Sequence, residues 1–253
     1  MEYYLFTFYW VDKVGRRLYL RKVIFWIFIV FFLLYGLIPG IFSAGFGLGV
    51  FRKGTSAQKV AFTFDDGPDP MYTPKLLDLL RKFDIKATFF VLGSKAEKNP
   101  ELIRRMYQEG HLIGIHNYTH QTNWLMTPWT IRRELNRSAV IIEQLTSVRP
   151  NYYRPPWGLL NLFDFFLHKQ YRIILWSLMV GDWRSEGGSE KIIRKLLHKI
   201  KDGSIVLLHD SGDTLGANQD APFYMIQALE VVFHEICHRG YTCVRIDQMM
   251  ELE

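Results

Sequence analysis

Cysteine is scarce in this chain of 253 residues, which carries only Cys237 and Cys243. Two cysteines are too few for the disulfide framework of a small secreted domain, and their spacing is not that of a zinc site. A bridge between them requires that their Cα atoms lie close together. The sequence leaves two interpretations open, a single disulfide or two buried thiols.

The chain also lacks an internal repeat and a basic tract interleaved with aromatic residues. Its 31 basic and 25 acidic residues give a formal net charge of +6, and the lysines and arginines are spread along the chain. We therefore predict no nucleic-acid partner, and nothing predicts a protein partner. The modest positive charge fits attraction to an anionic membrane or cell-wall surface, and equally a solvated surface that selects no charged partner.

Charge is absent from residues 23–50. At about 1.5 Å per residue, a helix of this length can cross a hydrocarbon core of about 30 Å, even with Pro39 ending or kinking it. Basic residues before the run outnumber those after it, so residues 1–22 are expected in the cytoplasm and the rest of the chain outside. We therefore expect a single-pass anchor in the cell membrane. A cleaved signal peptide is the alternative, with Ser-Ala-Gly at residues 43–45 as the cleavage site and a secreted product.

Residues 51–58 read as a connector, and residues 59–253 as one domain. In this domain apolar strand-like segments alternate with amphipathic helix-like ones, which is typical of a parallel α/β fold, either barrel or open sheet. Strands are predicted at residues 60–65, 87–92, 111–115, 152–154, 172–179, 203–209 and 242–245. Helices are predicted at residues 73–83, 100–108, 128–145, 159–169, 189–200 and 222–238, with Thr127 and Ser189 as N-caps.

Two adjacent carboxylates, Asp65 and Asp66, end the first of these strands, and Gly67-Pro68 then stops it. Active sites of parallel α/β folds are built at the carboxyl ends of strands. Neighbouring residues on an extended strand point to opposite sides, so one carboxylate can hold a metal while the other faces a reacting group. The alternative is a solvated Asp-Gly-Pro turn.

Two histidines, His116 and His120, follow the third strand. At a spacing of four residues they can bind one metal if the segment forms a helical turn. Together with Asp66 they would complete a site of two histidines and one carboxylate with open positions. Surface or structural histidines are the alternative explanation of the same spacing.

Three further strand ends carry polar or aromatic residues. The guanidinium fork of Arg154 can orient a carboxylate, and the backbone N–H of Trp157 is free to face a ligand. Asp182, beside Trp183, can orient a histidine, and a buried strand delivers His209 to the same rim. A structural turn, a surface loop and a structural histidine would explain each motif alone. Five motifs at successive strand ends are hard to produce by chance.

With these motifs in this order, residues 58–250 resemble the polysaccharide deacetylase family, carbohydrate esterase family 4. The resemblance rests on Thr-Phe-Asp-Asp-Gly-Pro at 63–68, His-Asn-Tyr-Thr-His at 116–120, Arg-Pro-Pro-Trp at 154–157, Asp-Trp at 182–183 and Leu-Leu-His at 207–209. Two positions depart from the family pattern. Asn117 replaces a hydroxyl residue that shapes the metal loop, and Met179 stands where many relatives carry an additional aspartate, which puts substrate subsites in question.

The resemblance implies a distorted (β/α) barrel for residues 59–253, preceded by one transmembrane helix, and the hydrolysis of N-acetyl groups on a polysaccharide. It also implies a divalent metal on Asp66, His116 and His120. Zinc is the first expectation, with cobalt, nickel or manganese as other candidates.

The remaining roles are implied in the same way. Asp65 would be the general base, oriented by Arg154, and His209 would be the general acid, oriented by Asp182. The residues expected around the substrate are Trp157, which gives its backbone N–H to the oxyanion, Trp183, which forms an apolar wall with it, and Leu207, which lines the acetyl pocket.

The expected partner is an N-acetylated polysaccharide outside the cell. Cell-wall peptidoglycan comes first because the anchor would hold the domain there, and a chitin-like polymer of GlcNAc comes second. Two alternatives remain open at this point: hydrolysis of a small non-sugar amide, and a catalytically silent protein that binds carbohydrate.

Overall fold

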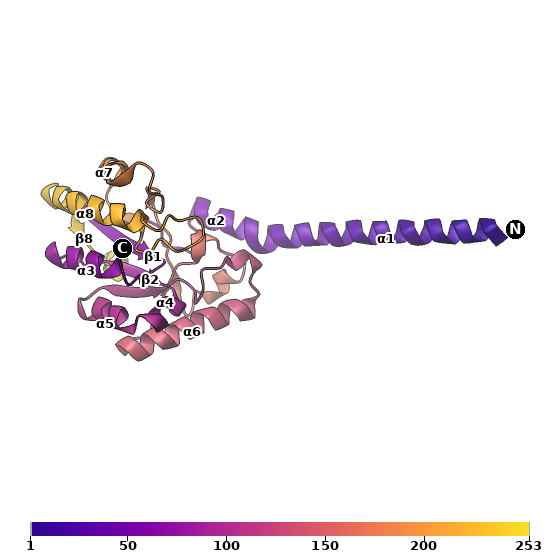
Figure 1. Cartoon of the computed structure of the whole chain (residues 1–253), viewed down its shortest axis with the longest axis horizontal. Coiled ribbons are helices and arrows are strands. Elements are labelled where there is room, and N and C mark those ends of the chain that lie inside the picture. Colours follow the sequence, from indigo (N-terminus) through magenta and orange to yellow (C-terminus); the bar gives the residue numbers. More distant parts are fainter. Residues whose placement is uncertain (1, 253) are drawn as a thin grey trace.

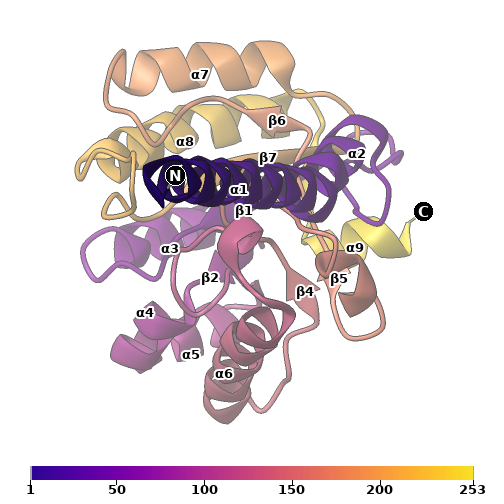
Figure 2. The same ribbon diagram turned by 90° about the vertical axis from the view of Figure 1, so that its right-hand side faces the viewer.

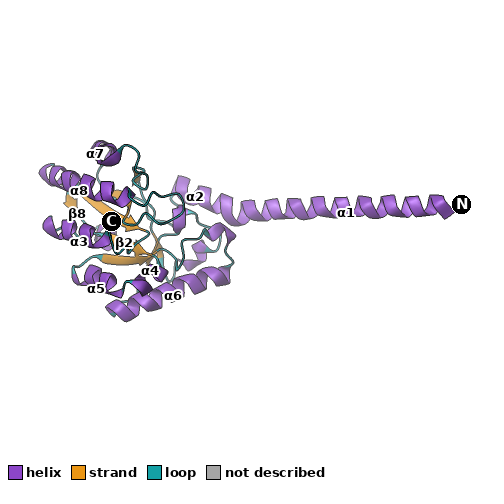
Figure 3. Cartoon of the chain, in the orientation of Figure 1, coloured by secondary structure: helices purple, strands orange, loops and turns teal. Residues whose placement is uncertain are grey.

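In the computed structural model, which describes residues 2–252, eight strands form one sheet in which every pair is parallel (Figures 1 and 3). The strands are β1 (Lys59–Asp65), β2 (Thr88–Val91), β3 (Leu112–Ile115), β4 (Tyr152–Tyr153), β5 (Arg172–Ile173), β6 (Leu178–Met179), β7 (Ser204–His209) and β8 (Thr242–Cys243). Their order is β5-β4-β3-β2-β1-β7-β6, and β8 pairs with the first two residues of β1. This curled sheet is the distorted (β/α) barrel that the resemblance implied.

Helices form a layer around the strands (Figure 2). They are α3 (Thr73–Lys82), α4 (Gly93–Lys98), α5 (Pro100–Gln108), α6 (Pro128–Thr146), α7 (Gly188–Lys199), α8 (Ala221–His238) and α9 (Ile246–Glu251), with 3₁₀ turns at η2 (Asn123–Leu125), η3 (Pro156–Gly158) and η4 (Asp164–Leu167). The N-terminal part comprises α1 (Glu2–Phe32), a π-helical stretch η1 (Leu33–Leu37) and α2 (Ile38–Phe46). Thr127 caps α6 as predicted, because its hydroxyl accepts from the backbone N–H of Thr130.

Alternation along β1 explains both the core and the position of the site. Phe62 and Phe64 face the helices, where Phe62 packs edge-on against Phe233 of α8 at 5.0 Å between ring centroids. Ala61 belongs to a smaller cluster on the other face, and the period of two sends Thr63 and Asp65 to that same inner face. Hydrophobic burial therefore fixes β1 in the core, and its carboxyl end places the side chain of Asp65 inside the curled sheet.

The predicted helix at 159–169 is wrong: only the short turn η4 forms there. The side chain of Asn161 accepts from the backbone N–H groups of Phe163 and Asp164, and Asp164 accepts from the N–H of Asn161 at 2.8 Å. Such local bonds offer the backbone an alternative to the helix.

The predicted strand at 172–179 is interrupted, so that β5 and β6 are separate. Between them Ile174 forms an isolated bridge with Phe51, and the carbonyls of Ile174 and Leu175 accept from Arg154. The prediction that Ser189 caps a helix is also wrong. The helix α7 starts at Gly188, and its N-cap is Gly187, which has a φ of 83°.

Both cysteines are free thiols. Cys237 is exposed and Cys243 is half-buried, so neither of the two interpretations that the sequence left open, a disulfide or a pair of buried thiols, describes them.

One helix of the described residues, Arg16–Ser43, is long and apolar enough to cross a membrane, with a mean hydropathy of 2.5. Its first part projects away from the domain, and its last turns lie on it (Figure 1). The Tyr35 hydroxyl donates to the carbonyl of Met126 at 2.8 Å, and the N–H of Leu162 donates to the carbonyl of Tyr35 at 2.7 Å. Gly36 lies against Trp124, whose Cγ would be 3.1 Å from a Cβ at that position. The end of the apolar helix is therefore packed against the domain.

Replacing Trp124 by alanine tests this packing. The indole contacts Gly36, Gly40 and the ring of Phe32, and its N–H donates to the carbonyl of Leu160 at 2.9 Å. Because the side chain is partly rather than fully buried, we expect the free energy of unfolding to fall by about 2 kcal/mol, below the roughly 3–5 kcal/mol of a fully buried aromatic side chain. Thermal unfolding of the full chain in detergent measures the loss.

Trp129→Ala is the matched control, because that tryptophan lies five residues away and is exposed. Equal melting temperatures of the two variants would show that the helix is not packed on the domain as described.

Candidate active site

The carboxyl ends of the strands surround a cavity of about 340 Å³. Eight of the ten residues predicted for the site line it: Asp65, Asp66, His116, His120, Trp157, Trp183, Leu207 and His209. The other two, Arg154 and Asp182, lie behind its wall and are fully buried. The structure therefore brings all ten side chains into one place, near the carboxyl ends of the strands.

Three of these side chains converge on one point. Oδ1 of Asp66 lies 3.3 Å from Nε2 of His116 and 3.3 Å from Nε2 of His120. The segment from His116 to His120 is an irregular loop and not the helical turn that the spacing required. The two rings meet because Asn117, between them, takes a left-handed conformation with a φ of 62°, as does Asp66 at 74°.

The donor set fits a divalent metal. Oδ1 of Asp66 is buried and has no hydrogen-bond partner. Nδ1 of His116 lies 2.7 Å from the carbonyl of Arg154, which can only accept, so this nitrogen carries the proton and Nε2 is free to bind a cation. Two imidazole nitrogens and one carboxylate are ligands that zinc and its neighbours prefer.

The charges of these groups agree with that fit. Burial alone would raise the pKa of Asp66, but the adjacent imidazole of His116 and the nearby His209 and His120 hold it well below its usual range. Burial lowers the pKa of His120 to about 4, against the opposing effect of Asp66. At neutral pH the carboxylate is therefore ionised and the imidazole of His120 neutral, the forms in which both bind metals.

Asn117 is held by a buried polar network. Its side chain donates to Oδ1 of Asn123 at 2.9 Å and accepts from the hydroxyl of Tyr153 at 3.0 Å. Asn123 also donates to Oδ1 of Asp164 at 2.9 Å. Asparagine tolerates the left-handed region better than most residues, so this departure from the family motif suits the loop. The motif predicted neither the network nor its partners.

Asp65 is held by a buried arginine. Nη1 of Arg154 donates to Oδ1 of Asp65 and to Oγ1 of Thr63, each at 2.7 Å. The other guanidinium donors bind the carbonyls of Ile174 and Leu175 at 3.1 Å. A buried charge is tolerated when it is paired and hydrogen-bonded, and here the pairing fixes the carboxylate of Asp65 at the cavity wall.

His209 is paired with a second buried carboxylate. Its Nδ1 lies 3.2 Å from Oδ2 of Asp182, which also accepts from its backbone N–H at 2.8 Å. Burial opposes protonation, but Asp182, and then Asp66 and Asp65, raise the pKa of His209 to about 9. The imidazole is therefore a cation at neutral pH and can donate a proton into the cavity.

Aromatic side chains form the mouth of the cavity. Trp157 has a φ of 55°, and its ring lies 4.2 Å edge-on from that of His120. The ring of Trp183 lies 5.5 Å edge-on from that of His209. Met179 lines the cavity at the position where the family pattern led us to expect an aspartate, which makes that part of the wall apolar.

Two site residues escaped the sequence analysis. The hydroxyl of Thr214 donates to Oδ2 of Asp66 at 2.7 Å, and nothing in the sequence of its loop marks it. Asp210 is buried beneath the first motif and accepts from the hydroxyl of Thr73, and its place after His209 at a strand end could have indicated it. A Cβ at Gly67 would lie 2.3 Å from Oδ2 of Asp210, which explains the glycine of that motif.

Comparisons with known proteins agree with this geometry. The family model described as polysaccharide deacetylase matches residues 52–162. A peptidoglycan-N-acetylglucosamine deacetylase of Bacillus cereus is 36% identical over 196 residues, which cover 76% of this chain and 68% of the relative. A chitooligosaccharide deacetylase of Sinorhizobium fredii is also 36% identical, over 78% of this chain and 94% of the relative.

The fold agrees as well. The crystal structure of a peptidoglycan N-acetylglucosamine deacetylase superposes with a TM-score of 0.74 and 30% identity, over 82% of this chain and 95% of the other. Together with the matched sequences, it shows that this chain belongs to the polysaccharide deacetylases of carbohydrate esterase family 4.

Proposed function

We propose that this chain is a membrane-anchored, metal-dependent N-deacetylase of cell-wall peptidoglycan, with a chitin-like GlcNAc polymer as the second candidate substrate. The observation that carries the proposal is the cavity in which Asp66, His116 and His120 converge beside Asp65 and His209. The names of the relatives above support the substrate class.

The metal would be held by Asp66, His116 and His120, whose ligand atoms lie within 4.8 Å of one another. Zinc is the first candidate, with cobalt, nickel and manganese next. When bound, such an ion supplies a water of lowered pKa and polarises a carbonyl. The hydroxyl of Thr214 would help to aim the Asp66 carboxylate by binding the oxygen that faces away from the histidines.

The side chains around that site would carry the proton transfers. Asp65, held by Arg154, would accept the proton of the attacking water. The backbone N–H of Trp157 would donate to the acetyl oxygen as negative charge develops there. His209 would then protonate the nitrogen that leaves, since an amine leaves poorly unless it is protonated. Asp182 would keep His209 in the required tautomer.

The cavity walls suit an acetylated sugar. Leu207 would face the acetyl methyl, and Trp157 and Trp183 would face the apolar side of a sugar ring. Two alternatives are hydrolysis of a small non-sugar amide and carbohydrate binding without catalysis. Hydrolysis of a small amide does not explain the aromatic residues at the mouth of the cavity. Binding without catalysis does not explain why an acid and a base are both held in position by buried partners.

We place residues 1–22 in the cytoplasm, the membrane span at 23–50, a connector at 51–58 and the catalytic domain at 59–253, on the outer face of the cell membrane. Cleavage at residues 43–45 and secretion is the alternative. It would separate the domain from Tyr35, whose hydroxyl and carbonyl bind two of its loops.

The first experiment measures acetate release by the full chain in detergent from peptidoglycan and from chito-oligosaccharides. We expect release that a chelator abolishes and zinc restores, and peptidoglycan should be the better substrate. Release that resists the chelator would contradict the metal, and release from small acetylated amides alone would favour the first alternative.

Asp65→Asn tests the general base. Because asparagine keeps the size of the side chain and an oxygen for Arg154, we expect kcat to fall by about a hundredfold to ten-thousandfold while the bound metal is unchanged. Elemental analysis of the purified variant gives the metal content. Asp84→Asn is the control, since this aspartate is exposed and its left-handed backbone suits asparagine. Unchanged turnover in Asp65→Asn would contradict the assignment.

Asp182→Asn tests the general acid through the pH profile. His209 must be protonated for activity, so activity should be lost as the pH rises through its pKa. That pKa is about 9 without a metal, and a bound cation should lower it because it offsets the nearby carboxylates. Removing the charge of Asp182 lowers that pKa and should move the alkaline limb of kcat/KM to lower pH. Asp220→Asn, an exposed change in a neighbouring loop, should leave the limb in place. A limb that does not move in Asp182→Asn would exclude His209 as the acid.

A further inference from the structure

Four large apolar side chains are exposed next to the packed end of the N-terminal helix. Leu125, Trp129, Leu162 and Phe166 have exposed fractions of 81%, 77%, 47% and 67%. We call these four residues the apolar rim. They come from two segments far apart in the sequence, and both segments bind the same residue of the helix, since Tyr35 bonds to the backbone of Met126 and of Leu162.

The length of free helix is too short for a membrane. The charge-free run begins after Lys22, and the helix first meets the domain at Phe32, whose ring lies 5.5 Å from that of Trp124. The nine residues between them span only about 14 Å, half of a hydrocarbon core of about 30 Å. A full crossing from Lys22 ends near Phe42, beyond the point where Tyr35 and Gly36 are packed against the domain.

We propose that the apolar rim lies in the outer leaflet of the bilayer that the helix crosses. The proposal rests on the membrane anchor proposed above and deepens it, because the domain would be a second membrane contact and not a globule tethered above the surface. Leucine and phenylalanine side chains suit the acyl region, and an exposed tryptophan suits the boundary with the headgroups.

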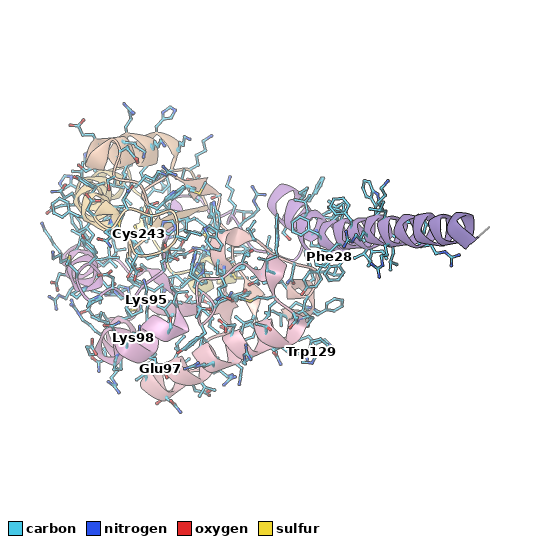
Figure 4. The ribbon with its side chains drawn as sticks, turned by 45° about the vertical axis from the view of Figure 1, so that its right-hand side comes forward. Phe28, Lys95, Glu97, Lys98, Trp129 and Cys243 are labelled. Atoms are coloured by element: carbon cyan, nitrogen blue, oxygen red, sulfur yellow. The ribbon has the colours of Figure 1, made fainter. Side chains whose placement is uncertain are left out.

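The arrangement of the rim agrees with this occupant. Trp129 lies at the end of α6 that faces the side from which the helix projects, as the positions of Phe28 and Trp129 in Figure 4 show. Arg132, one turn further along α6, lies 5.0 Å from the ring of Phe163 and is exposed, so its charge can meet anionic headgroups above the apolar side chains.

The same orientation affects the substrate. Because β8 pairs with the start of β1 and lies at the end of the domain away from α1, the carboxyl ends of the strands face the side of the projecting helix (Figure 1). The cavity lies at those carboxyl ends and hence on the bilayer side of the domain, so the glycan that reaches it would lie close to the membrane surface.

Depth measurements on the full chain test the rim. Cys237→Ser and Cys243→Ser remove both native thiols, of which the first is exposed and the second half-buried. Single cysteines are introduced as Leu125→Cys and Phe166→Cys, labelled with an environment-sensitive fluorophore and reconstituted in vesicles of phosphatidylcholine and phosphatidylglycerol at about 3:1. Quenching is measured with nitroxide-labelled lipid and with aqueous iodide.

Three control variants bracket the result. Val148→Cys and Val231→Cys carry the label at half-exposed valines, one just beyond the far end of α6 and one on α8. Phe28→Cys carries it in the helix itself, at the exposed phenylalanine labelled in Figure 4. Acetate release in detergent confirms that each labelled chain is folded.

We expect lipid quenching of the two rim labels to exceed that of the valine controls at least threefold, and iodide quenching to be correspondingly weaker. If lipid quenches the label at residue 28 but quenches the rim labels no more than the valine controls, the placement of the apolar rim in the bilayer is overturned. The membrane anchor then still stands. Rim labels shielded from both quenchers would overturn it in favour of a protein partner or a second copy of the chain. Absence of lipid quenching at residue 28 would overturn anchor and rim together, without bearing on the deacetylase chemistry.

Discussion

Burial of the Arg154 guanidinium is the constraint on which the rest of the site depends. A buried cation needs acceptors on every side, and it finds them in the carboxylate of Asp65, the hydroxyl of Thr63 and the carbonyls of two residues between β5 and β6. The chain there leaves the sheet to supply them, which splits a predicted strand in two. The carbonyl of Arg154 itself holds His116. One residue thus orients Asp65, the proposed base, and His116, a proposed metal ligand, so the two cannot be positioned independently.

Charge is distributed so that neighbouring groups keep different protonation states. Asp66 is anionic and His120 neutral at neutral pH, while His209 is a cation because Asp182 outweighs the cost of burying it. A metal-dependent hydrolase needs this separation, since the metal ligands must be free of protons at a pH where the general acid still carries one. The state of His209 depends on Asp182 behind the cavity wall, whereas that of Asp66 follows from the neighbouring histidines and that of His120 from burial.

The sequence was informative where regular structure positions a residue and uninformative where a loop does. Asp65 and His209 were predictable because a buried strand ends at each, and the alternating pattern sends their side chains to known faces. The meeting of His116 and His120 was predicted from a helical turn that does not form, since a single left-handed residue between them has no periodicity to reveal it. Thr214 lies on a loop whose path is fixed only by tertiary contacts, and no local pattern could reveal it.

A chain of hydrogen bonds through Asn161 and Asn123 joins the packed end of the apolar helix to the loop proposed to bind the metal. Asn161 donates to the hydroxyl of Tyr35 at 3.0 Å and to the carbonyl of Asn123 at 2.7 Å, and Asn123 accepts from the side chain of Asn117 at 2.9 Å. Each member is buried or partly buried, so a lost partner leaves an unsatisfied polar group. The asparagine that replaces a hydroxyl residue in the metal loop is therefore matched to polar partners that extend to the helix. The same helix that would set the height of the cavity above the bilayer thus also supports the loop that carries two of the proposed metal ligands.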